Sequence, residues 1–336
     1  MTVQSIGDLA RDFVQRRQAV SLAREMGRLT QEVSTGQVAD VARHLSGHLA
    51  PLADIDRALA LAEVRGGAAR LAATDAALMQ ASLGRVQSEA QGLAETALSV
   101  STTGGTVSLP LLAEEARGAL TAMIGALNGN SADRALFAGD RSDVAPLADA
   151  DTLLAQLRTA LAGAPDQAAV SAALDAFFDA PGGVFESTIY RGGAGSSAGV
   201  SLGAGETVAL RIRADDAALR AQIKSTAMAA LIADESLPLS AAERQETAGM
   251  LGRDLLAGQA GVIGLRAQLG SAEARIAAAE SRLGAERTSL AIARNDLVSA
   301  DIYAAATALE GVQFQLEALY TITARTARLN LAAFLS

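Results

Sequence analysis

Two histidines are the first residues in this sequence whose spacing could support chemistry. His44 and His48 lie four residues apart, and Asp40 lies four residues before His44. On a helix, this spacing places three possible metal ligands on one face. Gly47 interrupts the motif and no further ligand follows, so a solvated helix face is the simpler interpretation. We predict no metal site here.

A second motif has the form of a nucleophile elbow. The segment Gly199-Val-Ser201-Leu-Gly203 fits the pattern G-x-S-x-G. That chemistry needs a strand before the serine, a helix after it and a histidine further along the chain. Here both histidines lie upstream, and the residues after Gly203 resemble a hairpin. We therefore expect a turn, and the sequence predicts neither catalytic residues nor a cofactor site.

The composition narrows the class of protein that can contain these motifs. The chain has 336 residues, of which 50% are hydrophobic and only 3% aromatic, with no cysteine. Such an apolar fraction, built mainly from Ala, Leu and Val, favours helices over strands. The 28 cations are scattered among 37 anions, which argues against a nucleic-acid partner. Charges or glycines interrupt every apolar run, so we expect no membrane insertion and no cleaved secretory signal.

The C-terminal part of the sequence contains a regular heptad row. Ser240 and Glu243 form a capping-box pattern at its start. Large apolar residues then recur at seven-residue steps: Leu255, Val262, Leu269, Ile276, Leu283, Leu290 and Leu297. The positions three residues later are mostly small, which lets a partner helix approach closely. The row predicts a coiled-coil seam.

After Asp301 the phase of this pattern changes. Ile302, Leu309 and Leu316 form a new row after a five-residue step, which one continuous seam does not absorb. We interpret this as two helices, or as one helix that changes partner near Asp301. The chain then ends on an apolar group: Leu329, Leu331, Phe334 and Leu335.

The N-terminal part mirrors this arrangement. Leu22, Met26, Leu29 and Val33 form a row with steps of four and three residues, and Gly36 marks a possible break. A second row follows: Met79, Leu83, Val86, Ala90, Leu93, Ala97 and Val100. Two distant seams can bury each other, whereas a lone seam cannot. We therefore predict a mainly α fold, a long antiparallel coiled-coil helical rod formed by the N- and C-terminal arms.

The middle of the sequence differs from both arms. It is rich in proline, glycine and serine, and Val184–Tyr190 and Thr207–Ile212 resemble strands because β-branched and aromatic residues alternate in them. Ser101–Pro110 reads as a loop. We predict a small α+β insert and the following division: terminal assembly helices at 1–35 and 301–336, a helical rod domain at 36–139 and 206–300, and a variable insert at 140–205.

Three segments resemble the flagellin superfamily. The tail DIYAAATALEGVQFQLEALYTITARTARLNLAAFLS (Asp301–Ser336) is similar to the C-terminal helix of that family. Leu29–Gly36 (LTQEVSTG) resembles the stretch that closes the family's first helix. Asn130–Gly139 is similar to the signature that precedes the variable region, with Ala135 where tyrosine is usual.

The resemblance implies a structural protein that leaves the cell through flagellar type III export, without signal cleavage, and becomes part of the extracellular flagellum. Its terminal helices would assemble into an inner tube. The implied partners are further copies of the chain, hook-associated and filament subunits, and an export chaperone at the C-terminal end. Phe137-Ala-Gly139, Pro146-Leu and Tyr190-Arg-Gly-Gly favour a subunit that joins hook to filament. A filament flagellin and a non-flagellar coiled-coil assembly protein remain alternatives.

Overall fold

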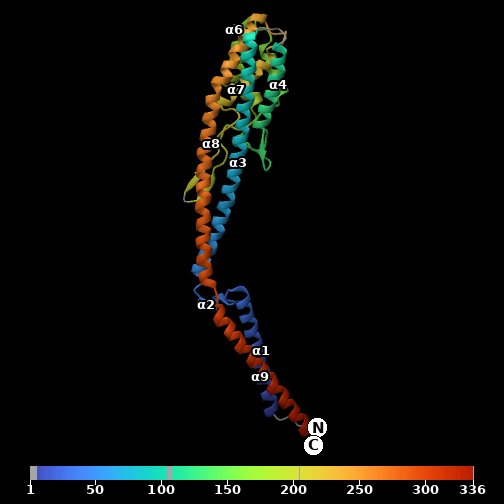
Figure 1. Ribbon diagram of the computed structural model, residues 1–336, viewed down its shortest axis with the longest axis vertical. Helices are drawn as coiled ribbons and strands as arrows, with labels where there is room; N and C mark the ends of the chain where they lie inside the picture. The colour runs from blue at the N-terminus through green and yellow to red at the C-terminus, as the bar shows by residue number, and fades with distance from the viewer. Residues whose placement is uncertain (1–5, 104–107, 204, 336) are drawn as a thin grey trace. The chain divides into compact units, whose positions relative to one another are not determined.

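The computed structural model describes the backbone of residues 6–103, 108–203 and 205–335, and the side chains of 6–9, 12, 103 and 326–335 lie outside the description. Long helices packed against each other dominate the fold, and the strands are few and short, as the sequence predicts (Figure 1). The chain divides into two compact units: unit 1 contains Met1–Glu63 with Ala285–Ser336, and unit 2 contains Val64–Gly284.

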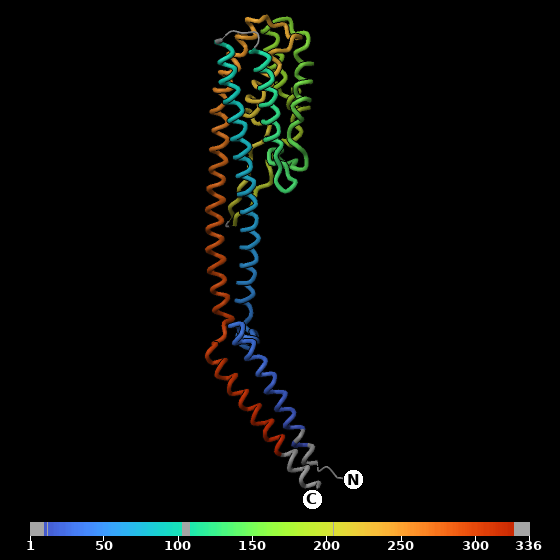
Figure 2. The backbone as a smooth tube through the Cα atoms, turned by 45° about the vertical axis from the view of Figure 1, so that its right-hand side comes forward, coloured from blue at the N-terminus to red at the C-terminus, as the bar shows by residue number. Residues whose placement is uncertain are grey.

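Two long helices form the frame of unit 2. They are α3 (Ala50–Thr103) and α8 (Ala241–Val298), which lie side by side and antiparallel (Figure 2). Gln80 Nε2 donates to Arg266 O at 2.9 Å. Near the C-terminal end of α3, Gln245 Nε2 donates to Ser101 O at 2.8 Å. Gly252 allows this approach, because a Cβ there would lie 2.8 Å from Leu98 Cγ. The predicted pairing of distant heptad rows is present in this unit.

The remaining elements of unit 2 cover one side of this frame. They are α4 (Ser108–Leu127), β1 (Asn130–Ser131), β2 (Arg134–Ala135), α5 (Ala150–Leu161), α6 (Gln167–Asp179), the π-helical turn η1 (Phe185–Ile189), β3 (Val200–Gly203), β4 (Glu206–Val208) and α7 (Ala217–Leu231). Helices α4 and α7 pack against each other, and α5 and α6 pack on them. A continuous apolar core runs from Met79 on α3 to Leu269 on α8 and includes Phe177, Phe178 and Phe185.

The two strand pairs of unit 2 are both antiparallel hairpins. Strand β1 pairs with β2, and β3 pairs with β4 in the register Val200↔Val208 and Ser201↔Thr207. The expected hairpin after Gly203 is therefore confirmed. The expected strand at Thr207–Ile212 is shorter than predicted, because pairing ends at Val208.

The expected strand at Val184–Tyr190 is wrong, because residues 185–189 form η1 instead. Along this segment, bridging to another part of the chain begins only at its end, where Leu147 pairs with Tyr190. The backbone bonds locally, with Tyr190 N donating to Phe185 O at 2.7 Å. Strand propensity depends on a partner and on burial, and here the packing of Phe185 against Phe178 prevails.

The loop expected at Ser101–Pro110 is also shorter than predicted. Helix α3 continues to Thr103, and α4 begins at Ser108. Pro110 lies in the first turn of α4, where its missing N–H costs no helical hydrogen bond.

Unit 1 is built on α1 (Ile6–Thr35) and α9 (Ile302–Leu335), which lie side by side in Figures 1 and 2. Their connections also pair: Val38 N donates to Val298 O, and Ala300 N donates to Gly36 O, both at 2.9 Å. Gly36 has φ +68°, a left-handed conformation that ends α1 without strain. The predicted break near Asp301 is a true helix boundary, because α8 ends at Val298 and α9 begins at Ile302.

The short helix α2 (Val41–His44) and the parts of α3 and α8 next to it complete unit 1. There Arg294 Nε donates to Asp56 Oδ1 at 2.7 Å and joins α8 to α3. Asp301 caps α9, since its Oδ1 accepts from Ala304 N at 2.9 Å.

Candidate assembly surfaces

The heptad row of α8 lies in the interior of unit 2 over most of its length. Leu255, Val262, Leu269, Ile276 and Leu283 are all buried. Leu255, Val262 and Leu269 belong to the main apolar core. Ile276 packs in a second cluster with Leu202 and Val208 of the β3–β4 hairpin. Leu290 and Leu297, which belong to unit 1, are half-buried. The row therefore lies on one face of α8 and packs against other residues of the same chain.

The terminal rows form the seam between α1 and α9. On α1, Leu29 is buried, and Leu22, Met26 and Val33 are half-buried. On α9, Leu316 is buried and Leu309 is half-buried. The side chains of Leu329, Phe334 and Leu335 lie outside the described residues. Among the described residues, α1 and α9 cover each other along this seam, and most of their other side chains are exposed.

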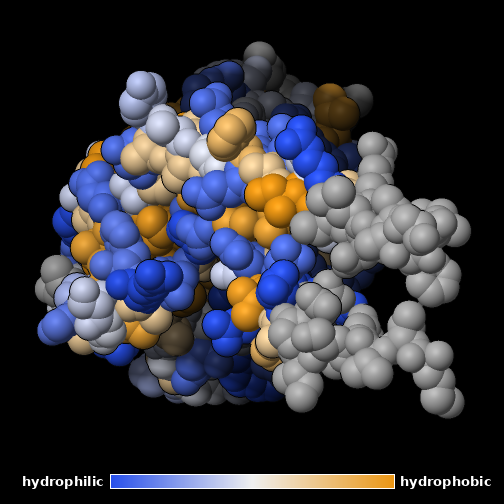
Figure 3. Space-filling model, turned by 90° about the horizontal axis from the view of Figure 1, so that it is seen from below, coloured by the Kyte–Doolittle hydropathy of each residue, from blue (hydrophilic) through white to orange (hydrophobic). Residues whose placement is uncertain are grey.

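Large apolar side chains are prominent on the exposed surface of α1 and α9. Phe13 is 66% exposed, Tyr303 84% and Phe314 73%. Val20 and Tyr320 are exposed as well. Figure 3 shows hydrophobic side chains scattered among hydrophilic ones on the visible face. The exposure of these residues is not expected from the sequence, where they belong to neither of the terminal rows.

An ion-pair network holds the end of α1 in unit 1. Arg28 bonds Glu32 at 2.7 Å and Glu25 at 2.5 Å. Glu32 is buried and also accepts from Ala39 N at 3.1 Å, which ties α1 to the connection that follows it. The hydrogen bond from Arg28 lowers the pKa of Glu25, and the two carboxylates raise the pKa of Arg28. This network has a positioning role within the unit.

The histidine motif does not form the helical face that its spacing suggested. Helix α2 ends at His44, so His48 lies beyond it, in the connection before α3. Asp40 caps α2, because its Oδ1 accepts from Arg43 N at 3.0 Å. Across residues 6–103, 108–203 and 205–335, no group of three or more potential ligand side chains is placed to hold a metal ion.

The elbow-like motif lies in the β3–β4 hairpin. Ser201 is on β3, followed by a bulge and β4 instead of a helix. Gly203 has φ +87° and lies against the side chain of Arg65. Arg282 Nη2 donates to Leu202 O at 3.3 Å and to Glu206 at 3.4 Å. The motif therefore shapes a hairpin that packs on α3 and α8.

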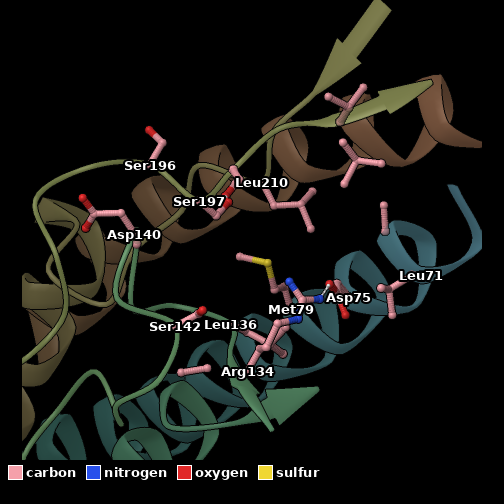
Figure 4. Close-up of a pocket in the computed structure, with 16 residues that line it drawn as sticks. Leu71, Asp75, Met79, Arg134, Leu136, Asp140, Ser142, Ser196, Ser197 and Leu210 are labelled. Atoms are coloured by element: carbon pink, nitrogen blue, oxygen red, sulfur yellow. Dashed lines mark hydrogen bonds and ion pairs between the residues drawn. The ribbon is translucent and has the colours of Figure 1, made fainter. Parts of the chain in front are cut away.

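A cavity of about 340 Å³ lies beside α3 in unit 2 (Figure 4). Its walls are largely apolar, with Leu71, Met79 and Leu210 among the lining residues. Asp75 lines it too and pairs with Arg134 at 2.7 Å. Asp75 Oδ1 has no hydrogen-bond partner among the described residues. The lining includes serines but no histidine, so it contains no nucleophile–base pair of the Ser-His type.

Comparison with known proteins gives a match to one family model over the C-terminal part of the chain. Residues 259–335 match the bacterial flagellin C-terminal helical region. The matched segment covers the second part of α8 and all of α9. No curated protein matches the chain.

None of the helices in the described part of the chain combines the length and apolar character needed to cross a membrane. Flagellins are structural proteins of the extracellular flagellum, and they assemble into a polymer. The matched region, which contains the exposed face of α9 and part of the α8 seam, supports the flagellin superfamily as the family of this chain, and with it a structural role in the flagellum.

Proposed function

We propose that this protein is the hook–filament junction subunit of a bacterial flagellum, of the kind known as hook-associated protein 3. It joins hook to filament by assembling through its terminal helices. One observation carries the assembly role: α1 and α9 cover each other along a single seam and leave Phe13, Tyr303 and Phe314 in solvent. Large exposed apolar groups of this kind are typical of surfaces that pack against other molecules.

The proposal assigns a task to each part of the chain. Residues 1–35 and 301–336 assemble into the inner tube, and 36–139 with 206–300 form the helical body. Residues 140–205 form a variable insert. Further copies of the chain, hook-associated subunits and filament subunits cover the terminal helices after assembly. Before assembly, an export chaperone covers the C-terminal end while the protein awaits type III export.

The junction role is favoured over that of a filament flagellin by the course of the chain after Phe137. The backbone turns at Gly139, where φ is +65° and a Cβ would lie 2.5 Å from Gly195 O. Tyr190 Oη donates to Gly193 O at 2.9 Å and holds the Tyr190-Arg-Gly-Gly segment against this turn. This is the part of the sequence that resembles subunits joining hook to filament.

Localisation separates the candidates directly. A fluorescent label on the protein in motile cells is expected at a single point between hook and filament. Label along the whole filament would identify a filament flagellin instead. Label that remains away from the flagellum would favour a non-flagellar coiled-coil assembly protein. A deletion of the last ten residues is expected to abolish incorporation, whereas shortening 140–205 leaves it intact.

A further inference from the structure

The proposed function gives no role to the cavity beside α3 in unit 2. Helix α3 forms one wall of this cavity, and residues of the segments 134–142 and 196–210 form the others. Its volume is about 340 Å³. An apolar cavity of about 150 Å³ is enough to hold a benzene ring, so this cavity has room for a ring and a polar group beside it.

Apolar side chains face the cavity from opposite walls. Figure 4 shows Met79 of α3 on one side and Leu210 on the other. Leu71 lines the cavity as well and is 46% exposed, so the cavity opens to solvent near this residue. Apolar walls with a few polar groups among them are the usual composition of a small-molecule site.

One carboxylate in the cavity is incompletely paired. Asp75 is 8% exposed and lies next to Arg134 (Figure 4). Its Oδ2 accepts from Arg134 Nη2 at 2.7 Å, whereas its Oδ1 is buried and has no hydrogen-bond partner among the described residues. A buried carboxylate oxygen without a donor is costly. A bound group that donates a hydrogen bond to this oxygen would remove that cost.

The hairpin of β1 and β2 brings Arg134 to this carboxylate. Ser131 pairs with Arg134 across a two-residue turn, in which Ala132 has φ +47° and Asp133 has φ +61°. Positive φ at both central residues is what a tight hairpin of this kind requires. The turn therefore places the arginine against α3, far from Asp75 in sequence.

The charges around the cavity favour a cation over other donors. Asp75 lines the cavity, Asp140 lies at its edge, and Arg134 is the one cationic side chain among the described residues that line it (Figure 4). The side chain of Arg134 is 50% exposed and that of Asp75 is 11% exposed, so water screens the arginine more strongly than the carboxylate. The site as a whole therefore attracts positive charge and repels anions.

We propose that this cavity binds a small organic cation, which consists of a primary ammonium group on an apolar body. The ammonium group donates to Asp75 Oδ1, and the apolar body packs against Met79 and Leu210. A charge-assisted hydrogen bond is about twice as strong as a neutral one, and the burial of apolar area adds to it. The site lies within unit 2, so the inference does not depend on the assembly role of the terminal helices.

Calorimetric titration of the full-chain monomer with benzylamine tests the site. At pH 7 this amine is protonated, and we expect it to bind saturably with one equivalent per chain. Benzyl alcohol offers the same ring with a neutral donor, and methylamine offers the charge without the ring. We expect the affinity for each of these two to be at least about tenfold lower. Benzoate, which has the opposite charge, is expected not to bind.

Substitutions at the two paired residues have opposite expected effects. Asp75→Asn keeps the size of the side chain and removes its charge, so benzylamine should bind at least about tenfold more weakly. Arg134→Gln removes the competing cation, so benzylamine should bind at least about threefold more tightly. Asp143→Asn and Arg141→Gln make the same changes at exposed positions that do not line the cavity, and both should bind like the wild type. Circular dichroism verifies that each variant is folded.

The results decide between a cation site and a cavity without charge selection. Binding that is selective for benzylamine, weakened by Asp75→Asn and strengthened by Arg134→Gln supports the proposal. Equal affinities for benzylamine and benzyl alcohol, or for the wild type and Asp75→Asn, would overturn it. The absence of saturable binding up to about 10 mM benzylamine would overturn it as well. If Asp75→Asn does not fold, Arg134→Gln decides, and unchanged affinity in that variant contradicts the proposal.

Discussion

The two units of this protein treat aromatic side chains in opposite ways. In unit 2, Phe137, Phe177, Phe178, Phe185 and Tyr190 are all buried. In unit 1, the aromatic residues whose side chains are described, which are Phe13, Tyr303, Phe314 and Tyr320, are all more than 60% exposed. Aromatic side chains bury a large apolar area, so their position shows where a fold completes its own core.

The comparison indicates that unit 2 is complete within one chain, whereas unit 1 is a pair of helices with unused apolar surface. Unit 2 closes its core with α4–α7 against α3 and α8. In unit 1, α1 and α9 supply each other's cover along a single seam. Helix pairs of this kind depend on tertiary packing for most of their stability. The difference predicts that mutations in unit 2 change folding, and that mutations on the outer face of unit 1 change assembly.

The largest expected effect is a charge placed in the seam of unit 2. Leu269 is 2% exposed, and Leu269→Asp buries a carboxylate without a partner among apolar side chains. We expect the free energy of unfolding to fall by at least about 3–5 kcal/mol, measured by urea denaturation followed by circular dichroism. The control is Gln268→Asp at the neighbouring exposed position, expected to stay within about 0.5 kcal/mol of wild type. Similar losses for both variants would argue against the seam.

A pair of phenylalanine substitutions tests the comparison itself. Phe185 is fully buried, with its ring centroid 5.3 Å from that of Phe178, whereas Phe314 is 73% exposed. Phe185→Ala is expected to lower the free energy of unfolding by about 3–5 kcal/mol. Phe314→Ala is expected to leave monomer stability nearly unchanged and to raise the critical concentration for assembly.

Thermal unfolding of the monomer and sedimentation of the polymer measure these two effects separately. If Phe314→Ala destabilises the monomer as much as Phe185→Ala does, the outer face of α9 is covered within the chain. The contrast between the units would then be wrong.

A smaller effect is expected at the start of α9. Asp301 accepts from Ala304 N, and Asp301→Ala removes this cap at a cost of about 1 kcal/mol. Because unit 1 is thinly packed, we expect hydrogen exchange to accelerate along α9 and to stay unchanged in α3 beside the unit 2 core. Asp254→Ala, at an exposed position within α8, is the control and should alter neither region. Acceleration spread evenly over both units would show that the units unfold together.

Much of the fold is readable from the sequence, because the long helices obey a local rule. The seven-residue steps from Leu255 to Leu283 identify a buried face, and the structure buries each of these residues. The capping box at Ser240 is present as well, with Ser240 N donating to Glu243 Oε2 at 2.7 Å. Periodicity and caps depend on neighbours within one or two turns, so they can be predicted without knowledge of the tertiary structure.

The features that the sequence analysis missed depend on distant contacts. The turn η1 replaces an expected strand, because Phe185 packs with Phe178 and pairing with Leu147 begins only at Tyr190. The exposed aromatic residues of α1 and α9 were missed for another reason. They lie outside the seam rows, and only the structure shows that the seam leaves Phe13 and Phe314 uncovered. A row of residues predicts a face, but the partner that covers the face is not encoded locally.

The last prediction concerns the ionisation of the buried tyrosine of unit 2, which takes place only at alkaline pH. Tyr190 Oη donates to Gly193 O at 2.9 Å, and burial raises the pKa of Tyr190 to about 12. A folded-state pKa above the unfolded value of about 10 means that the native state favours the neutral phenol. This contribution is complete below about pH 10 and is lost as the pH rises toward 12.

Because the chain has three tyrosines and no tryptophan, absorbance near 295 nm should resolve a late ionisation step. Tyr190→Phe should remove that step and the associated loss of stability, whereas Tyr303→Phe at the exposed position should retain both. A late step that survives Tyr190→Phe would belong to Tyr303 or Tyr320, and it would contradict the assignment of the late ionisation to the buried phenol of unit 2.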